Sequence, residues 1–123
     1  APFIQKAAAF ALTDPDVQHS AAEMRAGYAR RRQLVEELSK ESEESPLRVT
    51  PPAGAFYFFL DFRALNLPSL EICERILAEA GVGLVPGSAF GSQGEGFVRM
   101  SIAASDADVE AGFKAIMDWA ARQ

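Results

Sequence analysis

Residues 55–62 read Ala55-Phe56-Tyr57-Phe58-Phe59-Leu60-Asp61-Phe62. The stretch has the length of a strand, and aromatic side chains fall on both of its alternating faces. A strand that is covered on both sides is the simplest interpretation. The preceding residues 50–54, with two prolines and a glycine, predict a turn, because proline cannot donate to a sheet ladder. Residues 47–49 predict a short strand before that turn.

Beyond the aromatic strand, the pattern alternates between helix and strand. Ser69 can cap a short helix that Gly81 ends, and its predicted apolar face is Leu70, Cys73, Ile76, Leu77 and Ala80. Strands are predicted over residues 82–86 and 97–103, with a glycine-rich loop over residues 87–96 between them. Ser105 and Asp108 predict the start of a last helix, whose core-facing residues are Val109, Phe113, Ile116, Met117 and Ala120.

Two helices are predicted before the sheet. Residues 2–12 form a short apolar helix that stops at Thr13-Asp14-Pro15, and Asp14 can cap the helix that follows. That second helix is long, runs to about Ser39, and carries one narrow stripe of Val17, Ala21, Met24, Tyr28, Arg31, Val35 and Leu38. Arg31 interrupts the stripe with a charge, and residues 40–46 form a polar exit. The whole order predicts an α+β sandwich, in which a small, mostly antiparallel sheet packs against helices and a long N-terminal helix acts as a linker.

Composition excludes several classes of protein. The chain has 123 residues, 49% hydrophobic, which suits one globular domain. A net charge of -5 makes nucleic acid a poor partner, and no apolar stretch approaches the ~20 residues of a membrane span. The single cysteine, Cys73, excludes an intrachain disulfide and is interpreted as a buried apolar residue. It fits a reducing compartment, so a cytoplasmic location is predicted.

Most of the candidate chemical groups have a structural interpretation. Residues 91–96 resemble a phosphate cradle only superficially, because a strand follows them and not a helix N-terminus, so a flexible turn is predicted. His19, the only histidine, is predicted to be exposed on a helix. Lys6, Lys40 and Lys114 lie in no setting that would activate an amine for Schiff-base chemistry. No residue is therefore assigned to catalysis, cofactor binding or metal binding.

Arg99 is the strongest candidate for a binding role. Alternation places it with Phe97 and Ser101 on one sheet face, opposite Val98 and Met100. A guanidinium in the middle of a strand needs a partner, either a substrate carboxylate that pairs with its fork of donors or a structural Asp or Glu. From spacing alone, the structural ion pair is the better interpretation.

Four segments, in order, resemble the fold type I aminotransferases of the aspartate aminotransferase-like family. They are Pro2-Phe3-Ile4-Gln5-Lys6-Ala7-Ala8, Pro52-Ala53-Gly54-Ala55-Phe56-Tyr57, residues 80–91 (AGVGLVPGSAFG) and Gly96-Phe97-Val98-Arg99-Met100-Ser101-Ile102-Ala103. Together they cover essentially the whole chain, and they are specific as a set although each is weak alone. The resemblance implies that residues 1–123 are the C-terminal small domain and that residues 1–15 connect it to a large domain that precedes residue 1.

The resemblance also implies a function. Arg99 takes the position that binds the α-carboxylate of amino acid and keto acid substrates, which reverses the interpretation from spacing alone. The Schiff-base lysine and most contacts to pyridoxal 5'-phosphate are expected in the large domain, so the cofactor belongs to the full-length protein, a homodimer, and this chain alone is expected to be inactive. A lyase or synthase that uses the same cofactor and scaffold remains an alternative, as does a freestanding, non-catalytic α+β module that binds a ligand or a protein.

Overall fold

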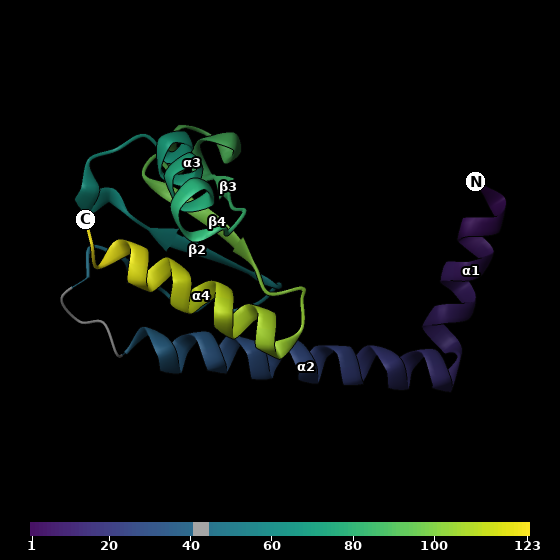
Figure 1. Ribbon diagram of the computed structural model, residues 1–123. Coiled ribbons are helices and arrows are strands. Elements are labelled where there is room, and N and C mark those ends of the chain that lie inside the picture. Colours follow the sequence, from purple (N-terminus) through teal and green to yellow (C-terminus); the bar gives the residue numbers. More distant parts are fainter. Residues whose placement is uncertain (41–44) are drawn as a thin grey trace. The chain divides into compact units, whose positions relative to one another are not determined.

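The computed structural model describes residues 1–40 and 45–123 (Figure 1). The helices are α1 (Pro2–Thr13), α2 (Pro15–Ser39), α3 (Ser69–Ala80) and α4 (Asp106–Ala120), and the strands are β1 (Arg48–Val49), β2 (Tyr57–Asp61), β3 (Val85–Pro86) and β4 (Phe97–Ser101). Short 3₁₀ helices are η1 (Arg63–Leu65), η2 (Gly87–Phe90) and η3 (Ser92–Gly94). Part of the predicted polar exit, residues 41–44, lies outside the described residues. The chain divides into two compact units, Ala1–Arg30 and Arg31–Gln123.

The first unit consists of α1 and the N-terminal part of α2. The Asp14 carboxylate accepts hydrogen bonds from the backbone N–H groups of Asp16 and Val17, each at 3.1 Å, which confirms the predicted cap. The large apolar side chains of this unit are exposed; they are Phe3, Ile4, Phe10, Leu12 and Met24. The predicted stripe therefore does not act as one buried seam, since Met24 is exposed whereas Val35 and Leu38, in the second unit, are buried.

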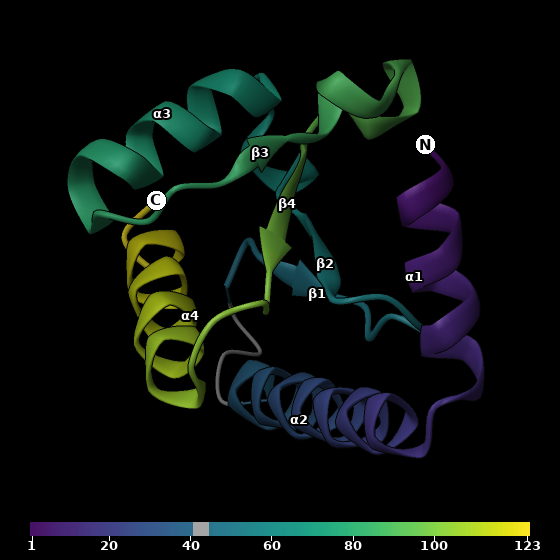
Figure 2. The ribbon, with the colours of Figure 1, turned by 90° about the vertical axis from the view of Figure 1, so that its right-hand side faces the viewer.

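The second unit contains an antiparallel sheet in the order β1-β2-β4-β3. Phe59 and Val85 lie opposite Arg99, on either side of β4, and Phe58 lies opposite Met100. Helices α3 and α4 lie on the same side of this sheet (Figure 2). The predicted α+β architecture with a small antiparallel sheet is confirmed.

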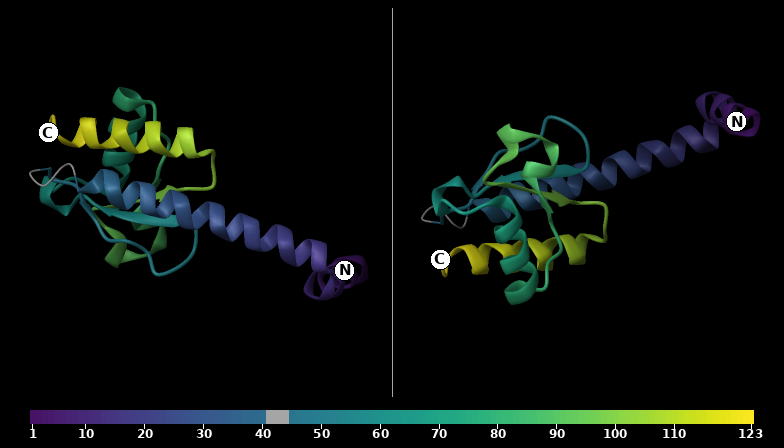
Figure 3. Two further views of the ribbon diagram at one scale, coloured as in Figure 1. Left: turned by 90° about the horizontal axis from the view of Figure 1, so that it is seen from below. Right: turned by 90° about the horizontal axis from the view of Figure 1, so that it is seen from above.

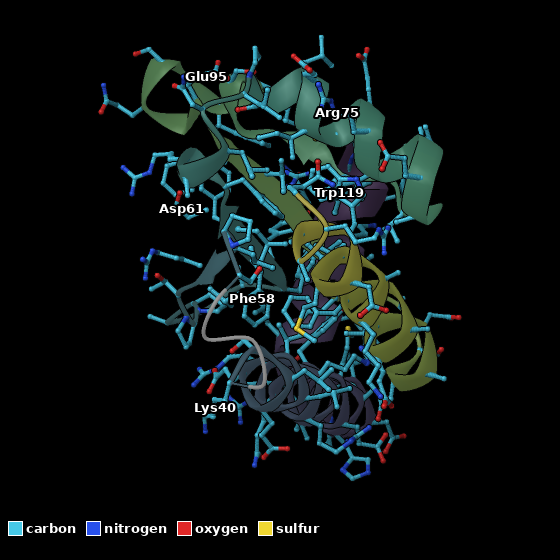
Figure 4. The ribbon with its side chains drawn as sticks, turned by 60° about the vertical axis from the view of Figure 1, so that its left-hand side comes forward. Lys40, Phe58, Asp61, Arg75, Glu95 and Trp119 are labelled. Carbon is cyan, nitrogen blue, oxygen red and sulfur yellow. The ribbon has the colours of Figure 1, made fainter. Side chains whose placement is uncertain are left out.

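One sheet face is covered by these helices and forms the core. Its buried side chains, here called the covered face, are Phe58, Leu60, Val98 and Met100. Buried residues of α3 and α4 also belong to the core, namely Ile72, Cys73, Ile76, Val109, Phe113, Ile116 and Trp119. Figure 4 shows Phe58 and Trp119 inside the molecule, where the Trp119 ring meets the Phe62 ring edge-on at 5.9 Å. Its indole N–H donates to Glu79 at 3.0 Å, so the one polar atom of this core ring is satisfied.

The prediction that the aromatic strand is covered on both sides is wrong. Along β2, Phe58 and Leu60 are buried, Tyr57 and Asp61 are half-buried, and Phe59 is 38% exposed. The opposite side of the sheet has no α-helix of the second unit over it (Figure 2). Its aromatic side chains contact one another and two arginines, so their rings do not require a second layer of helices to form contacts.

The start of α3 also differs from the prediction. Ser69 does not cap the helix; Pro68 precedes its first turn and Ser69 is its first residue. The buried Ser69 hydroxyl accepts from the Gly96 N–H at 2.8 Å and donates to the Gly94 carbonyl at 3.2 Å. The hydroxyl thus ties α3 to the chain that enters β4. Leu70 and Leu77 are more than half exposed, and Ile72 is buried in their place.

The C-terminal part of α2 and α4 lie alongside each other on the helical side of the second unit (Figure 3). Arg31 connects them, because its Nε donates to Asp106 at 2.7 Å and its Nη1 to the Ile102 carbonyl at 3.3 Å. The charge that interrupts the predicted stripe therefore links α2 to the first residue of α4 and to Ile102, just after β4. The predicted caps at the other helix ends hold, with Ser105 accepting from the Asp108 N–H at 3.1 Å and Gly81 ending α3 in a left-handed conformation.

Candidate functional site

Arg99 is the third residue of β4, in the middle of the sheet. Its side chain lies on the face opposite to the covered face, here called the open face, together with Tyr57, Phe59 and Phe97. This placement follows from strand alternation, because Val98 and Met100 on either side of Arg99 are buried against the helices. The predicted position of the guanidinium is confirmed.

Two aromatic rings cover the guanidinium of Arg99. Its Cζ atom lies 4.3 Å from the centre of the Tyr57 ring and 4.8 Å from the centre of the Phe90 ring. Both contacts fall within the range of a cation–π interaction. Tyr57 comes from the neighbouring strand and Phe90 from the end of η2, so the side chain is held by residues from two separate segments.

Arg99 has no carboxylate partner among the described residues. Its Nε is the one buried side-chain polar atom in residues 1–40 and 45–123 that lacks a hydrogen bond. Its terminal Nη atoms have no hydrogen bond either, and they do not belong to the buried atoms, so they remain open to solvent. The structural ion pair favoured by spacing alone is therefore wrong within the described residues. Buried polar groups in folded proteins are nearly always paired, so this guanidinium has the character of an incomplete site.

Three rings of the open face form a connected row, here called the aromatic row: Phe90, Phe59 and Phe97. Phe59 meets Phe90 edge-on at 6.0 Å and stacks on Phe97 at 5.1 Å. The far end of the row carries a second guanidinium, because Arg63 lies 4.7 Å from the centre of the Phe97 ring. Each end of the row thus holds an arginine.

The two arginines differ in their charge partners. Arg63 donates from Nη2 to Asp61 at 2.8 Å and from Nε to the same carboxylate at 3.0 Å. This hydrogen-bonded guanidinium lowers the pKa of Asp61, and the carboxylate raises that of Arg63. Arg63 is therefore satisfied inside the chain, whereas Arg99 is not.

Phe90 is held over Arg99 by the packing of η2 against η3. A Cβ on Gly87 would lie 2.2 Å from the Gly94 carbonyl oxygen, and one on Gly94 would lie 2.1 Å from the Gly87 oxygen. Only glycine fits at both positions, because the two backbones touch. The predicted flexible turn over residues 91–96 contains η3, which packs compactly against η2, and a strand, β4, follows it as predicted.

An open groove of about 440 Å³ lies beside this loop and is lined by Arg63, Asn66, Leu67, Pro68, Glu95 and Gly96. Glu95, labelled in Figure 4, accepts a hydrogen bond from the Ser69 N–H at 2.6 Å, and this bond lowers the pKa of Glu95. The carboxylate is therefore used to hold the start of α3. Among the described residues, no group of His, Cys, Asp and Glu side chains is arranged to hold a metal ion.

The other candidates have the structural roles predicted for them. His19 is exposed and lies 3.5 Å from Glu23. Cys73 is buried, and burial raises the pKa of its thiol to about 11, so the reactive thiolate is disfavoured. Lys114 pairs with Glu110 at 2.6 Å on α4, on the far side of the sheet from Arg99. Lys6 and Lys40 are exposed on α1 and at the end of α2. In the described residues, no helix is both long enough and apolar enough to cross a bilayer.

The sequence analysis missed the two rings that cover Arg99. Tyr57 could have been found, because alternation puts it on the same face of a neighbouring strand. Phe90 could not, because its place depends on the contact between Gly87 and Gly94, which residue spacing does not reveal.

Comparison with known proteins identifies the family. Residues 2–116 match the model of the family described as aminotransferase class I and II. The chain is 48% identical over 101 residues to an aspartate aminotransferase of Pyrococcus abyssi, which covers 82% of this chain and 25% of that protein. It is 40% identical over 118 residues to a probable aspartate/prephenate aminotransferase of Aquifex aeolicus, covering 93% of this chain and 29% of the relative.

Comparison of the fold with solved structures gives the same family. An aromatic aminotransferase from Pyrococcus horikoshii superposes with a TM-score of 0.86 and 41% identity, covering 98% of this chain and 31% of that structure. The chain thus spans between a quarter and a third of the length of these relatives. It belongs to the class I and II aminotransferase family and corresponds to the C-terminal small domain of the fold type I members.

Proposed function

We propose that this chain is the part of a pyridoxal-phosphate-dependent aminotransferase that binds the α-carboxylate of the substrate, and that Arg99 is the residue that binds it. One observation carries the proposal. Arg99 presents a guanidinium in the middle of a sheet, with a buried Nε that lacks an acceptor and with no carboxylate partner in the described residues. An arginine in this state is suited to an anion that comes from outside the chain.

The chemistry of the guanidinium fits this role. Its donors form a planar fork that pairs with both oxygens of a carboxylate, so it fixes the orientation of the ligand as well as its charge. Amino acids and keto acids both carry an α-carboxylate, and one arginine can hold both. When bound, pyridoxal phosphate supplies the electron sink for bond cleavage at Cα. Arg99 contributes by holding the substrate so that the bond to be cleaved is aligned.

The described residues do not fit the cofactor itself. Of the lysines, Lys114 is paired with Glu110 on the other side of the sheet, and Lys6 and Lys40 are exposed. We therefore assign to this chain the substrate contact only, and we expect the cofactor contacts in a large domain that residues 1–15 connect to it. The isolated chain is expected to be inactive, and the full-length protein to be a cytoplasmic homodimer that acts on amino acid and keto acid substrates.

No observation favours the alternatives. A lyase or synthase on the same scaffold needs the same carboxylate contact, but the relatives reported above are named as aminotransferases. A freestanding module that binds an anionic ligand could use the same guanidinium, but residues 2–116 match the aminotransferase class I and II family. Assay of the full-length protein for amino transfer to a keto acid, against pyruvate release from cystathionine, separates the two enzyme classes.

The proposal is tested by replacing Arg99 in the full-length protein. Arg99→Ala should lower kcat/KM for amino acid donors. The expected decrease corresponds to about 2–5 kcal/mol of lost transition-state binding, which is the range for removing one member of a buried charge pair. Arg99→Lys keeps the charge but loses the fork, and a loss of at least about tenfold is expected.

Arg63→Ala is the matched control, because Arg63 also lies against a ring of the open face but is neutralised by Asp61. It should leave the substrate KM within about twofold, since a surface ion pair contributes about 0–1 kcal/mol. Equal effects of the Arg63 and Arg99 substitutions, or an unchanged KM in Arg99→Ala, would remove the proposed role.

A further inference from the structure

The geometry points to Tyr57 and Phe90 as specificity-determining residues that restrict the Arg99 site to planar carboxylates and exclude tetrahedral anions. This inference rests on the proposed function of Arg99 and goes beyond it, because it assigns a role to the two rings and names the class of anion that they reject. Tyr57, Arg99 and Phe90 together are here called the aromatic slot.

The rings of Tyr57 and Phe90 restrict access to the Arg99 guanidinium. The ring centres of Tyr57 and Phe90 lie 4.3 and 4.8 Å from the Arg99 Cζ, which leaves no room for another group between either ring and the cation. An anion is therefore excluded from the sides of the guanidinium that these two rings contact. It can approach at the Nη end, because Nε is buried whereas the Nη atoms are not among the buried atoms.

Carboxylates differ in shape from sulfonates and phosphonates. Both oxygens of a carboxylate lie in one plane, so the group can pair with the guanidinium in that plane. A sulfonate or phosphonate is tetrahedral, and when two of its oxygens pair in the plane, the third stands out of it, toward one of the rings. The π face of a ring carries partial negative charge, so it repels an anionic oxygen as well as blocking it. The slot therefore favours the planar anion.

The aromatic slot can select between anions only if its walls hold their position. Phe90 is 53% exposed, but it is held by Phe59, which in turn stacks on Phe97. Its backbone is fixed by the contact between Gly87 and Gly94. Tyr57 belongs to β2, whose neighbour in the ladder is β4 itself. Both walls are thus attached to the framework that carries Arg99.

The test compares two small anions of equal charge, propionate and ethanesulfonate. Each is measured as a competitive inhibitor of the full-length enzyme against the amino acid donor on which that enzyme is fastest. The unmodified enzyme should bind propionate more tightly by at least about tenfold. Phe90→Leu and Tyr57→Leu should each reduce this ratio of inhibition constants by about three- to tenfold, because each removes one wall and leaves the guanidinium in place.

Conservative variants and a control separate the slot from a merely structural role. Phe90→Tyr and Tyr57→Phe keep the rings and should keep the ratio. Leu77→Ala removes an exposed apolar side chain of α3, on the other side of the sheet from Arg99, and it should also keep the ratio. Loss of general stability changes the affinity for both anions alike, so it leaves the ratio unchanged.

The outcomes distinguish the two proposals. A raised substrate KM in Arg99→Lys with an unchanged anion ratio in both leucine variants overturns the slot and leaves the role of Arg99 standing. An unchanged KM in Arg99→Lys overturns the proposed function and the slot with it. If one leucine variant fails to fold with its cofactor, the other decides, and a ratio near one in the unmodified enzyme overturns the inference without any variant.

Discussion

The two faces of the sheet are built from the same two strands but are completed in different ways. On the covered face, Phe58, Leu60, Val98 and Met100 are buried against helices of the same chain. On the open face, the aromatic row carries an arginine at each end, and one of these has a donor without an acceptor. The covered face thus contributes the burial that stabilises the fold, while the open face carries the guanidinium that we propose as the substrate contact.

The largest expected effect comes from neighbouring phenylalanines on opposite faces. Phe58→Ala removes a fully buried ring and should lower the free energy of unfolding by about 3–5 kcal/mol. Phe59→Ala removes a ring that is 38% exposed, and it should cost only about 1 kcal/mol. Urea denaturation of the chain measures both. Equal losses would contradict the division of the sheet into a stabilising face and a binding face.

A smaller effect is expected at the loop that carries Phe90 to the open face. Gly87→Ala should lower the free energy of unfolding by about 1–3 kcal/mol, because the new Cβ would overlap the Gly94 carbonyl oxygen. Gly83→Ala is the control, since a Cβ there meets nothing within 4 Å, and a change within about 0.5 kcal/mol is expected. If both variants unfold at the same urea concentration as the parent chain, η2 does not depend on the glycine contact.

The smallest effect concerns pH. The Ser69 N–H lowers the pKa of Glu95 in the folded chain below its ordinary value of 4.5, so the bond adds stability above that pH and loses it as the pH falls through the folded value. Glu95→Gln should therefore reduce the loss of stability between about pH 7 and about pH 3.5. Part of the loss should remain, because the pKa of Asp61 is also lowered.

Asp118→Asn, at an exposed position of α4, provides the control for that measurement. Melting temperatures at the two pH values, taken for both variants and the parent chain, give the comparison. If the melting temperature of Glu95→Gln falls between the two pH values as much as that of the parent chain, this carboxylate does not hold α3 in solution.

Local sequence patterns predicted the features that depend on neighbouring residues. Alternation placed Arg99 on its face, and the helix ends at Asp14, Gly81 and Ser105 follow from capping chemistry. The family followed from motifs spread over the chain, and it is confirmed by the match over residues 2–116. Trp119 was missed, although it lies one helical turn after Ile116 and is fully buried.

Such patterns could not predict contacts between residues that are distant in sequence. Serine is a residue type that often caps helices, but the Ser69 hydroxyl forms hydrogen bonds with Gly94 and Gly96, about 25 residues away in the chain. The aromatic strand was expected to be covered on both sides, because sequence does not distinguish a ring that packs on a helix from one that packs on an arginine. The absence of an ionic partner for Arg99 likewise needed coordinates, since any acidic residue in the chain was a possible partner.

The edges of the sheet have a consequence for association. The outer strands β1 and β3 contain two residues each, and Pro86 in β3 has no N–H to offer. Because these edge strands are so short, a second molecule finds few backbone N–H and C=O groups to pair with. The sheet therefore resists the edge-to-edge polymerisation to which exposed strands are prone. Self-association of this chain should therefore proceed through side chains and not through shared sheets.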